Sequence, residues 1–268
     1  MSSDKKGQIT QSAAEIYESF FVPALFEAWP PRLADIAGIQ KDWHTLDVAC
    51  GTGTLARHLA TRTGHASAVS GVDINPDMLS IARAKNPNID WRLAPAEQLP
   101  FPDECFDGVF SQFGLMFFND PARAIQEMHR VLRPGGKLVV AVWDALENSP
   151  GYSALATLLQ AEFGTEVARE LHAPYRLGVP GSLSGLLEDA GIDEFHIGAM
   201  AGTAVFKSLE DWMHTEIKGW TLADSLNDAQ FDTLLTQAHS KLQAFVGQSG
   251  SVSFPAPALV AHTVKAPS

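Results

Sequence analysis

The sequence contains few of the residues that characterise secreted, metal-binding or membrane-spanning proteins. Among its 268 residues only two are cysteines, Cys50 and Cys105, too few for a disulfide framework and not spaced as a CxxC metal site. No segment comes near the roughly 18 consecutive apolar residues that a membrane-spanning helix needs. The start of the chain, MSSDKKGQIT, lacks the apolar centre of a signal peptide. We therefore expect a cytoplasmic protein with no resident metal and no membrane insertion.

Positive charge is also scarce. The chain carries 19 Lys+Arg against 31 Asp+Glu, which gives a formal net charge of −12. A field of this sign repels nucleic-acid phosphates and anionic lipid headgroups. The charge therefore argues against nucleic acid and against a membrane surface as partners.

Between residues 45 and 143, short β-type runs alternate with helical ones. Most of these runs are almost continuously apolar, which is typical of parallel strands covered by helices on both faces. The pattern predicts an α/β fold with a doubly wound, mostly parallel, Rossmann-like sheet. The predicted strands are Thr45–Cys50, Ala68–Ile74, Ile89–Leu93, Phe106–Phe110 and Lys137–Trp143.

The segments on either side of this core are expected to be helical additions to one domain. Residues 1–44 would form an N-terminal helical cap, whose helix Pro30-Pro31 is expected to end. Residues 45–145 would be the nucleotide-binding core, and 146–268 the rest of the same domain. That last part is expected to hold helical lid insertions at about 146–180 and 207–250, an extended segment at 195–206 and an antiparallel last strand at 252–264.

A glycine-containing turn after the first predicted strand is the most informative motif. Gly51 and Gly53 allow a tight turn and a close approach of a ligand to the main chain. Asp73 ends the second predicted strand, where a carboxylate can accept hydrogen bonds from both hydroxyls of a ribose. The same spacing fits a nicotinamide-dinucleotide site. Asp47, however, would repel a pyrophosphate and suits a ligand with ammonium and sulfonium charges.

Three stretches together resemble class I S-adenosylmethionine-dependent methyltransferases, most closely the ubiquinone/menaquinone-biosynthesis subgroup. The stretches are LDVACGTGTLARHLA, GVDINPDMLSIARAK and AEQLPFPDECFDGVFSQFGLMFFNDPARAIQEMHRVLRPGGKLVVAVW, which cover about residues 45–143. The resemblance implies S-adenosylmethionine as cofactor, S-adenosylhomocysteine as product, and a small-molecule acceptor that attacks the sulfonium methyl in line. A nicotinamide-dependent oxidoreductase, or a module that binds the cofactor without turnover, remains as an alternative.

The resemblance also implies roles for the residues of the glycine turn. Gly51 and Gly53 would pass beneath the methionine part of the cofactor, Asp47 would support the turn, and Ala49 would line it. Asp73 would hold the ribose hydroxyls.

The adenine would lie against residues of the next two segments. Ile74 and Met78 would pack on the ring, while Ala96 and Glu97 would contact its edge. Many relatives have an acidic residue just before this Ala-Glu pair, but here the position is Pro95, which has no side-chain acceptor. Adenine recognition would then depend on Glu97, a carbonyl oxygen or water.

The resemblance places the reacting methyl and the acceptor beyond the fourth strand and beneath the N-terminal helix. Ser111, Gln112 and Phe113 would border the sulfonium, and Tyr17 would cap the cofactor. No catalytic residue is evident. The weak candidates to bind or deprotonate an acceptor are His172, Tyr175, Arg176 and His214. The aromatic residues of the late insertion favour a hydrophobic acceptor only weakly, because aromatics at helical spacing are more often part of a core.

Overall fold

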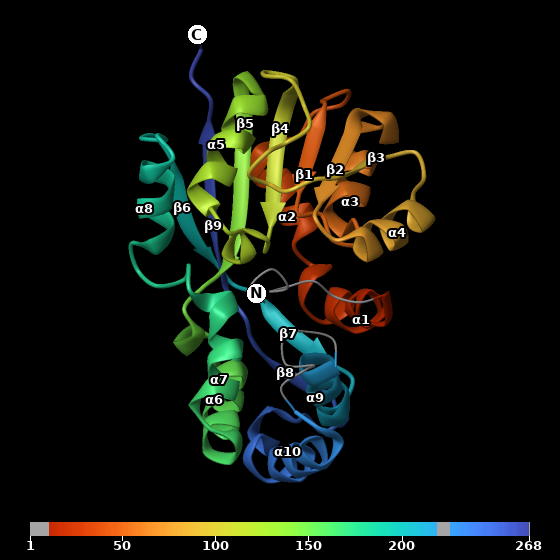
Figure 1. Cartoon of the computed structure of the whole chain (residues 1–268), viewed down its shortest axis with the longest axis vertical. Helices are drawn as coiled ribbons and strands as arrows, with labels where there is room; N and C mark the ends of the chain where they lie inside the picture. Colours follow the sequence, from red (N-terminus) through yellow and green to blue (C-terminus); the bar gives the residue numbers. More distant parts are fainter. Residues whose placement is uncertain (1–10, 219–225, 268) are drawn as a thin grey trace, which may run out of the picture.

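The computed structural model describes residues 11–218 and 226–267 and is built around a seven-stranded sheet (Figure 1). The strand order is β3-β2-β1-β4-β5-β9-β6. Strands β1 to β5 run parallel, and β9 is antiparallel to both of its neighbours. The predicted doubly wound sheet with an antiparallel last strand is confirmed. The strands are β1 Thr45–Val48, β2 Val69–Asp73, β3 Asp90–Leu93, β4 Phe106–Gln112, β5 Leu132–Trp143, β6 His196–Met200 and β9 Ala258–Val264.

Helices cover both faces of the sheet (Figure 1). On one face α2 packs beside α3, and on the other α5 packs beside α8. As a result, the centre of β5, residues 139–142, is fully buried, which explains its uniformly apolar sequence. The helices are α2 Pro30–Ala37, α3 Thr54–Thr63, α4 Pro76–Lys85, α5 Pro121–Val131 and α8 Ser182–Asp189; single 3-10 turns are η2 Ala66–Ala68, η3 Leu115–Phe117, η4 Leu146–Asn148, η5 Ala173–Tyr175 and η6 Gln243–Phe245.

A second group of elements lies below the sheet in Figure 1, beyond the carboxyl ends of the parallel strands. We call it the lower lobe. It comprises α6 Pro150–Phe163, α7 Thr165–His172, β7 Thr203–Phe206, α9 Leu209–Lys218, α10 Asp228–Lys241 and β8 Val252–Pro255. Its aromatic side chains pack on one another: the Trp212 ring lies 4.7 Å from that of Phe254 and 5.8 Å from that of Phe206. These aromatic residues therefore form a core of the lobe, as aromatic residues at helical spacing more often do.

The N-terminal segment departs from the sequence-based expectation. It begins with α1 Gln11–Ile16, which continues as a π-helix, η1 Tyr17–Phe26. The expectation that Pro30-Pro31 ends a helix is wrong, because these prolines occupy the first turn of α2. A proline is tolerated there since the first N–H groups of a helix have no partner within it.

Two segments expected to be single extended stretches each form two strands. Residues 195–206 give β6 and β7, and residues 252–264 give β8 and β9. β6 pairs with β9 in the large sheet and β7 with β8 in a separate two-stranded sheet. Between the two pairings the ribbon changes direction, where Ala256 donates its N–H to the Gly202 carbonyl at 2.9 Å. Pro257, which has no N–H for a ladder, lies at this bend.

Lys265, near the end of the chain, closes the carboxyl end of α5. Its ammonium donates to the carbonyl oxygens of Leu132 at 2.8 Å and His129 at 3.1 Å and pairs with Glu104 at 3.5 Å. A cation there satisfies carbonyls that a helix leaves open and interacts favourably with its dipole. We expect Lys265→Met to lower the free energy of unfolding in urea by about 1–2 kcal/mol. The exposed Lys207→Met serves as control, and an equal loss in both variants would contradict this role.

Candidate functional site

The turn after β1 brings a buried carboxylate to the carboxyl edge of the sheet. Asp47 is 1% exposed, and its Oδ2 accepts the N–H of Ala56 at 3.0 Å. Its Oδ1 is buried and has no hydrogen-bond partner among the described residues. Burial raises the pKa of Asp47 to about 8, although the Ala56 N–H opposes the shift. The site thus holds a carboxyl group with one oxygen that can still accept a hydrogen bond.

The backbone of this turn is held in an unusual conformation. Ala49, Gly51 and Gly53 all have left-handed φ angles, of 58°, 53° and 83°. For the alanine this costs about 1–2 kcal/mol. Such strain is typical of turns whose shape serves a ligand.

Asp73, at the end of β2, connects the two loops that follow β1 and β2. Its carboxylate accepts the N–H groups of Gly51 and Asn75, each at 2.8 Å. Burial raises the pKa of Asp73 above its usual value, and these N–H groups oppose the rise. The Asn75 side chain in turn caps α4 by accepting from Asp77 N at 2.9 Å. Asp73 is thereby fixed at the edge where a ligand would meet it.

The Tyr17 side chain lies against the glycine turn, and its expected role in capping the cofactor stays a prediction. A Cβ placed on Gly51 would lie 3.7 Å from the Tyr17 hydroxyl oxygen. Burial and the nearby carboxylate of Asp73 raise the pKa of Tyr17, so its phenol stays neutral. Glu18 anchors this segment through ion pairs with Arg57, at 3.6 Å, and Lys85. The N-terminal helix is therefore fastened to α3 and α4.

The residues expected around adenine differ in their exposure. Ile74 is 54% exposed, whereas Met78 and Ala96 are buried. Glu97 uses Oε1 to accept the main-chain N–H groups of Asn119 at 3.0 Å and Asp120 at 3.2 Å. One of its oxygens is thus committed to the start of α5, which sequence reasoning did not anticipate.

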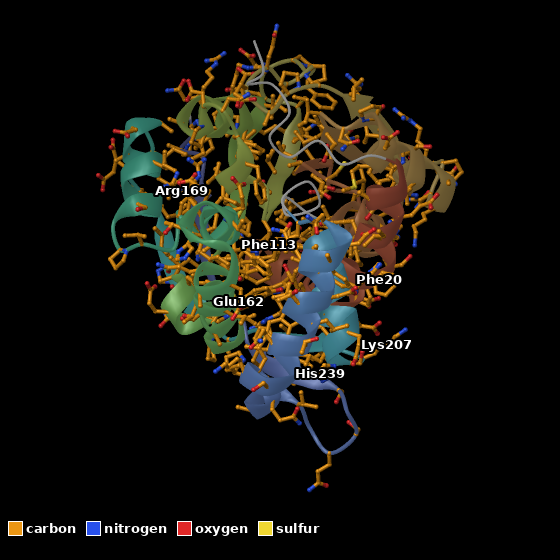
Figure 2. The ribbon with its side chains drawn as sticks, turned by 60° about the horizontal axis from the view of Figure 1, so that its bottom comes forward. Phe20, Phe113, Glu162, Arg169, Lys207 and His239 are labelled. Carbon is orange, nitrogen blue, oxygen red and sulfur yellow. The ribbon has the colours of Figure 1, made fainter. Side chains whose placement is uncertain are left out.

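β4 extends to Gln112, two residues beyond the expected end, so Ser111 and Gln112 belong to the strand and only Phe113 follows it. Ser111 Oγ and Gln112 Oε1 are buried without a hydrogen-bond partner in the described chain. The Phe113 ring, by contrast, belongs to the core: it stacks on Trp143 with centroids 3.9 Å apart and meets Trp29 edge-on at 5.3 Å. Figure 2 shows Phe113 near the middle of the molecule. Its main chain has a left-handed φ of 56°, and its place beside a cofactor stays a prediction.

These unpartnered atoms fit a cationic amino-acid ligand. The buried acceptors Asp47 Oδ1, Ser111 Oγ and Gln112 Oε1 come from β1 and its neighbour β4. An ammonium group offers the donors that such oxygens require. Thr52, whose Oγ1 is also buried and unpartnered within the described residues, was missed by sequence reasoning. Its position between the two loop glycines was the available signal.

The weak catalytic candidates do not form one cluster. His172 is exposed at the end of α7, and His214 lies against Phe20 with ring centroids 5.7 Å apart. Arg176 donates to the main-chain carbonyls of Met116 at 2.8 Å and Phe118 at 3.4 Å. Tyr175 is buried, and both burial and Glu216 raise its pKa well above the usual value. Arg176 thus binds main-chain groups around η3, and Tyr175 belongs to the packed interior.

A buried pair in the lower lobe escaped sequence reasoning. Tyr152 on α6 donates its hydroxyl to Glu216 Oε1 on α9 at 2.6 Å. Burial raises the pKa of Glu216 to about 8, although the Tyr152 hydrogen bond opposes the rise. The carboxyl is therefore mostly protonated at neutral pH. Residues 64 positions apart carry no local sequence signal for such a contact.

Two further observations concern the whole of the described chain. None of its helices is long and apolar enough to cross a membrane. No group of three or more His, Cys, Asp or Glu side chains in it could hold a metal ion. Cys50 and Cys105 are both free thiols.

Comparisons with known proteins show similarity to methyltransferases. Residues 46–140 match the model of a family described as "Methyltransferase domain". The chain is 32% identical over 218 residues to the ubiquinone/menaquinone biosynthesis C-methyltransferase UbiE of Bordetella parapertussis, covering 75% of this chain and 84% of that protein. It is 48% identical over 97 residues to demethylmenaquinone methyltransferase of Chlorobaculum parvum, covering 36% and 39%.

Solved structures show the same fold. One is phosphoethanolamine N-methyltransferase 2 of Haemonchus contortus in complex with S-adenosyl-L-methionine, with a TM-score of 0.61 at 20% identity over 96% of this chain and 58% of that one. Another is the YcgJ protein of Bacillus subtilis, with a TM-score of 0.61 at 15% identity over 90% and 99%. Both share the architecture described above.

Proposed function

Because the chain belongs to the S-adenosylmethionine-dependent methyltransferase family that includes these ubiquinone/menaquinone biosynthesis enzymes, we propose that the turn after β1 and the ends of β2 and β4 form its cofactor site. The protein is an S-adenosylmethionine-dependent methyltransferase that acts on a small molecule. The alternative of a nicotinamide-dependent oxidoreductase is set aside. The observation that carries the proposed site is Asp73, fixed by Gly51 and Asn75 beside buried acceptors without partners.

Within this site, Asp73 holds the ribose hydroxyls, and Ile74, Met78 and the Ala96 N–H receive the adenine. Gly51 and Gly53 leave room for the methionine part of the cofactor. Asp47 Oδ1 accepts a hydrogen bond from its ammonium group. The cofactor supplies a methyl group already activated on a sulfonium. The chain's own residues therefore act mainly by orienting the acceptor and excluding water.

We propose further that the acceptor is hydrophobic and binds between Tyr17 and the lower lobe. The two sequence relatives named above, UbiE and demethylmenaquinone methyltransferase, carry quinones in their names. Phe20 on η1 meets His214 on α9, so the N-terminal segment and the lobe approach each other beyond the strand ends. The lid role of the lobe and a cytoplasmic location stay predictions.

An acceptor panel tests this assignment. The protein is incubated with S-adenosylmethionine and either short-chain demethylated naphthoquinols and benzoquinols or polar acceptors such as phosphoethanolamine, and S-adenosylhomocysteine is measured. We expect product only with the apolar ring acceptors. Product only with polar acceptors would contradict a hydrophobic acceptor. Cofactor binding without product from any acceptor in a broad panel would favour a module without turnover.

The raised pKa of Asp47 predicts that cofactor affinity depends on pH. A carboxyl group with a pKa of about 8 is mostly protonated at pH 6, but only its ionised form attracts an ammonium. Binding therefore releases a proton, and the affinity for S-adenosylmethionine should rise between pH 6 and 7.5 by up to about tenfold per pH unit. Calorimetric titration measures this slope. Adenosine, which has no ammonium, should bind without it; equal slopes for both ligands would contradict this role of Asp47.

A further inference from the structure

The connection between β3 and β4 is the parallel crossover without a helix. The connections β1–β2, β2–β3 and β4–β5 pass through α3, α4 and α5, whereas residues 94–105, which lead from the edge strand β3 past β2 and β1 to β4, form a loop of turns. Near the start of this loop, at the carboxyl edge, lie Ala96 and Glu97, the residues proposed to face the adenine edge. Because it lacks the internal hydrogen bonds of a helix, its backbone groups need other partners.

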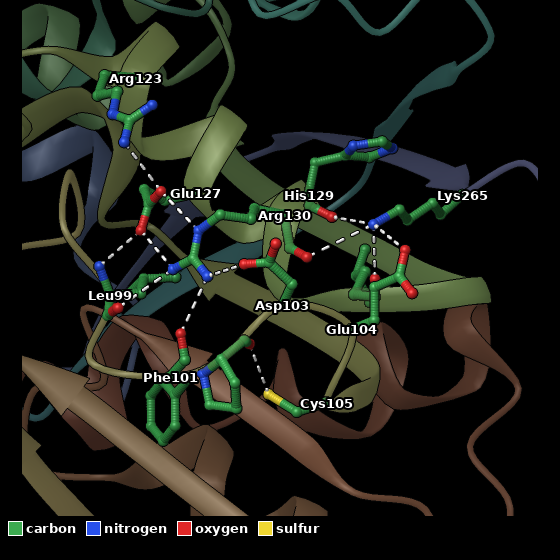
Figure 3. Close-up of polar contacts among 12 residues, drawn as sticks. Leu99, Phe101, Asp103, Glu104, Cys105, Arg123, Glu127, His129, Arg130 and Lys265 are labelled. Atoms are coloured by element: carbon green, nitrogen blue, oxygen red, sulfur yellow. Dashed lines mark hydrogen bonds and ion pairs between the residues drawn. The ribbon is translucent and has the colours of Figure 1, made fainter. Parts of the chain in front are cut away.

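Arg130 on α5 provides those partners with its whole guanidinium group (Figure 3). Its Nη2 donates to the Leu99 carbonyl at 3.2 Å, and its Nη1 to the Phe101 carbonyl at 3.0 Å. Nη1 also donates to Asp103 at 2.6 Å, while Nε and Nη2 donate to the two oxygens of Glu127 at 2.8 and 2.7 Å. These five bonds match the five N–H donors of arginine.

Glu127 completes the attachment from the same helix. Its residue is only 3% exposed, and its Oε2 accepts the Leu99 N–H at 3.0 Å. The Arg130 side chain holds the pKa of Glu127 below its usual range, against the effect of burial. Leu99 is therefore bound through both its N–H and its carbonyl to one bidentate ion pair, a geometry that resists displacement.

The other end of α5 is tied to the same loop. Glu97 accepts the N–H groups of Asn119 and Asp120, and the Asp120 side chain caps the helix by accepting Arg123 N at 2.9 Å. The loop segment 97–103 is thus fixed at both ends of α5. Ala96 lies immediately before the first of these attachments.

We propose that Arg130 is a positioning residue for the cofactor, which holds the Ala96–Glu97 segment against the adenine end by binding the carbonyls of Leu99 and Phe101. The inference rests on the proposed cofactor site. It assigns part of the affinity for adenosyl ligands to a side chain that faces α5 and the loop rather than the ligand. Lysine cannot replace this function, because its three donors radiate from a single atom and do not form a planar fork.

Calorimetric titration with S-adenosylhomocysteine and with adenosine tests this role. Arg130→Lys keeps a positive charge beside the buried Glu127. Arg130→Met would leave that carboxylate unpaired, and the resulting loss of stability would obscure the effect on binding. We expect Arg130→Lys to weaken both ligands by about tenfold, because lysine cannot bind the Leu99 and Phe101 carbonyls and both Glu127 oxygens at once, so the 96–97 segment loses its fixed position. Arg123→Met, on the same helix and with one bond to Glu127 at 3.0 Å, should change either affinity less than twofold.

The melting temperature separates positioning from stability. Loss of affinity in an Arg130→Lys protein that melts close to the wild type supports the proposal. Affinities within twofold of the wild type in that variant overturn it, as does an equal loss in Arg123→Met. If the wild type itself binds neither ligand, or if Asp73→Ala binds as well as the wild type, the proposed cofactor site fails instead.

Discussion

Replacing Asp73 by alanine is expected to weaken binding of S-adenosylmethionine and S-adenosylhomocysteine by at least about 100-fold. Two hydrogen bonds from ribose hydroxyls to a carboxylate contribute about 1.5–3 kcal/mol each, and 1.4 kcal/mol corresponds to about tenfold in affinity. The substitution also frees the Gly51 and Asn75 N–H groups that Asp73 now accepts, which loosens the turn. Calorimetric titration of both ligands measures the effect.

Asp35→Ala provides a control away from the site. Asp35 is exposed on α2 and pairs with Arg62 at 2.7 Å, so its loss should leave ligand affinity within about twofold, as for other exposed ion pairs. Asp73→Ala binding that stays within tenfold of the wild type, in a protein that remains folded, would remove Asp73 from the site.

Replacing Gly53 by alanine is expected to destabilise the protein by about 2–5 kcal/mol. Gly53 has a φ of 83°, which costs an L-residue about 1–2 kcal/mol. Its new Cβ would also overlap the Trp91 ring. That ring cannot readily move, because its Nε1 donates to the Asn86 carbonyl at 2.8 Å and the ring also lies against Gly71. Overpacking of this kind adds about 1–3 kcal/mol.

Gly181→Ala separates these two causes. Gly181 has the same φ of 83°, and nothing lies within 4 Å of its ideal Cβ position. Urea unfolding should therefore show a loss of about 1–2 kcal/mol for Gly181→Ala and a clearly larger one for Gly53→Ala. Equal losses would show that Trp91 moves aside, and that the glycine is needed only for its backbone conformation.

The parts of the fold that could be predicted are those set by local pattern. The apolar run 137–143 indicated a strand covered on both faces, and β5 confirms it, although it begins earlier, at Leu132. Asn75 followed by Pro76 is a pattern typical of a helix start, and the Asn75 side chain caps α4. The glycine turn and Asp73 were recognisable because each follows or ends one of two successive parallel strands, and the carboxyl ends of such strands meet at one edge of the sheet. The Gly51 N–H does bind Asp73.

The parts that could not be predicted depend on contacts distant in sequence. Proline can end a helix or begin one, and only the packing of α2 shows that Pro30 begins it. The stacking of the Phe113 ring on Trp143, at the end of β5, joins residues 30 positions apart and was not predicted. The Tyr152–Glu216 and Arg130–Leu99 contacts join segments with no shared local pattern.

The most direct measurement of the proposed cofactor site is a crystal structure of the protein with S-adenosylhomocysteine. The account predicts the ribose hydroxyls on the Asp73 carboxylate, the amino-acid end over Gly51 with its ammonium near Asp47, and the adenine between Ile74 and the 96–97 segment. A ligand bound elsewhere, or one bound with Asp73 still making contact only to Gly51 and Asn75, would contradict it.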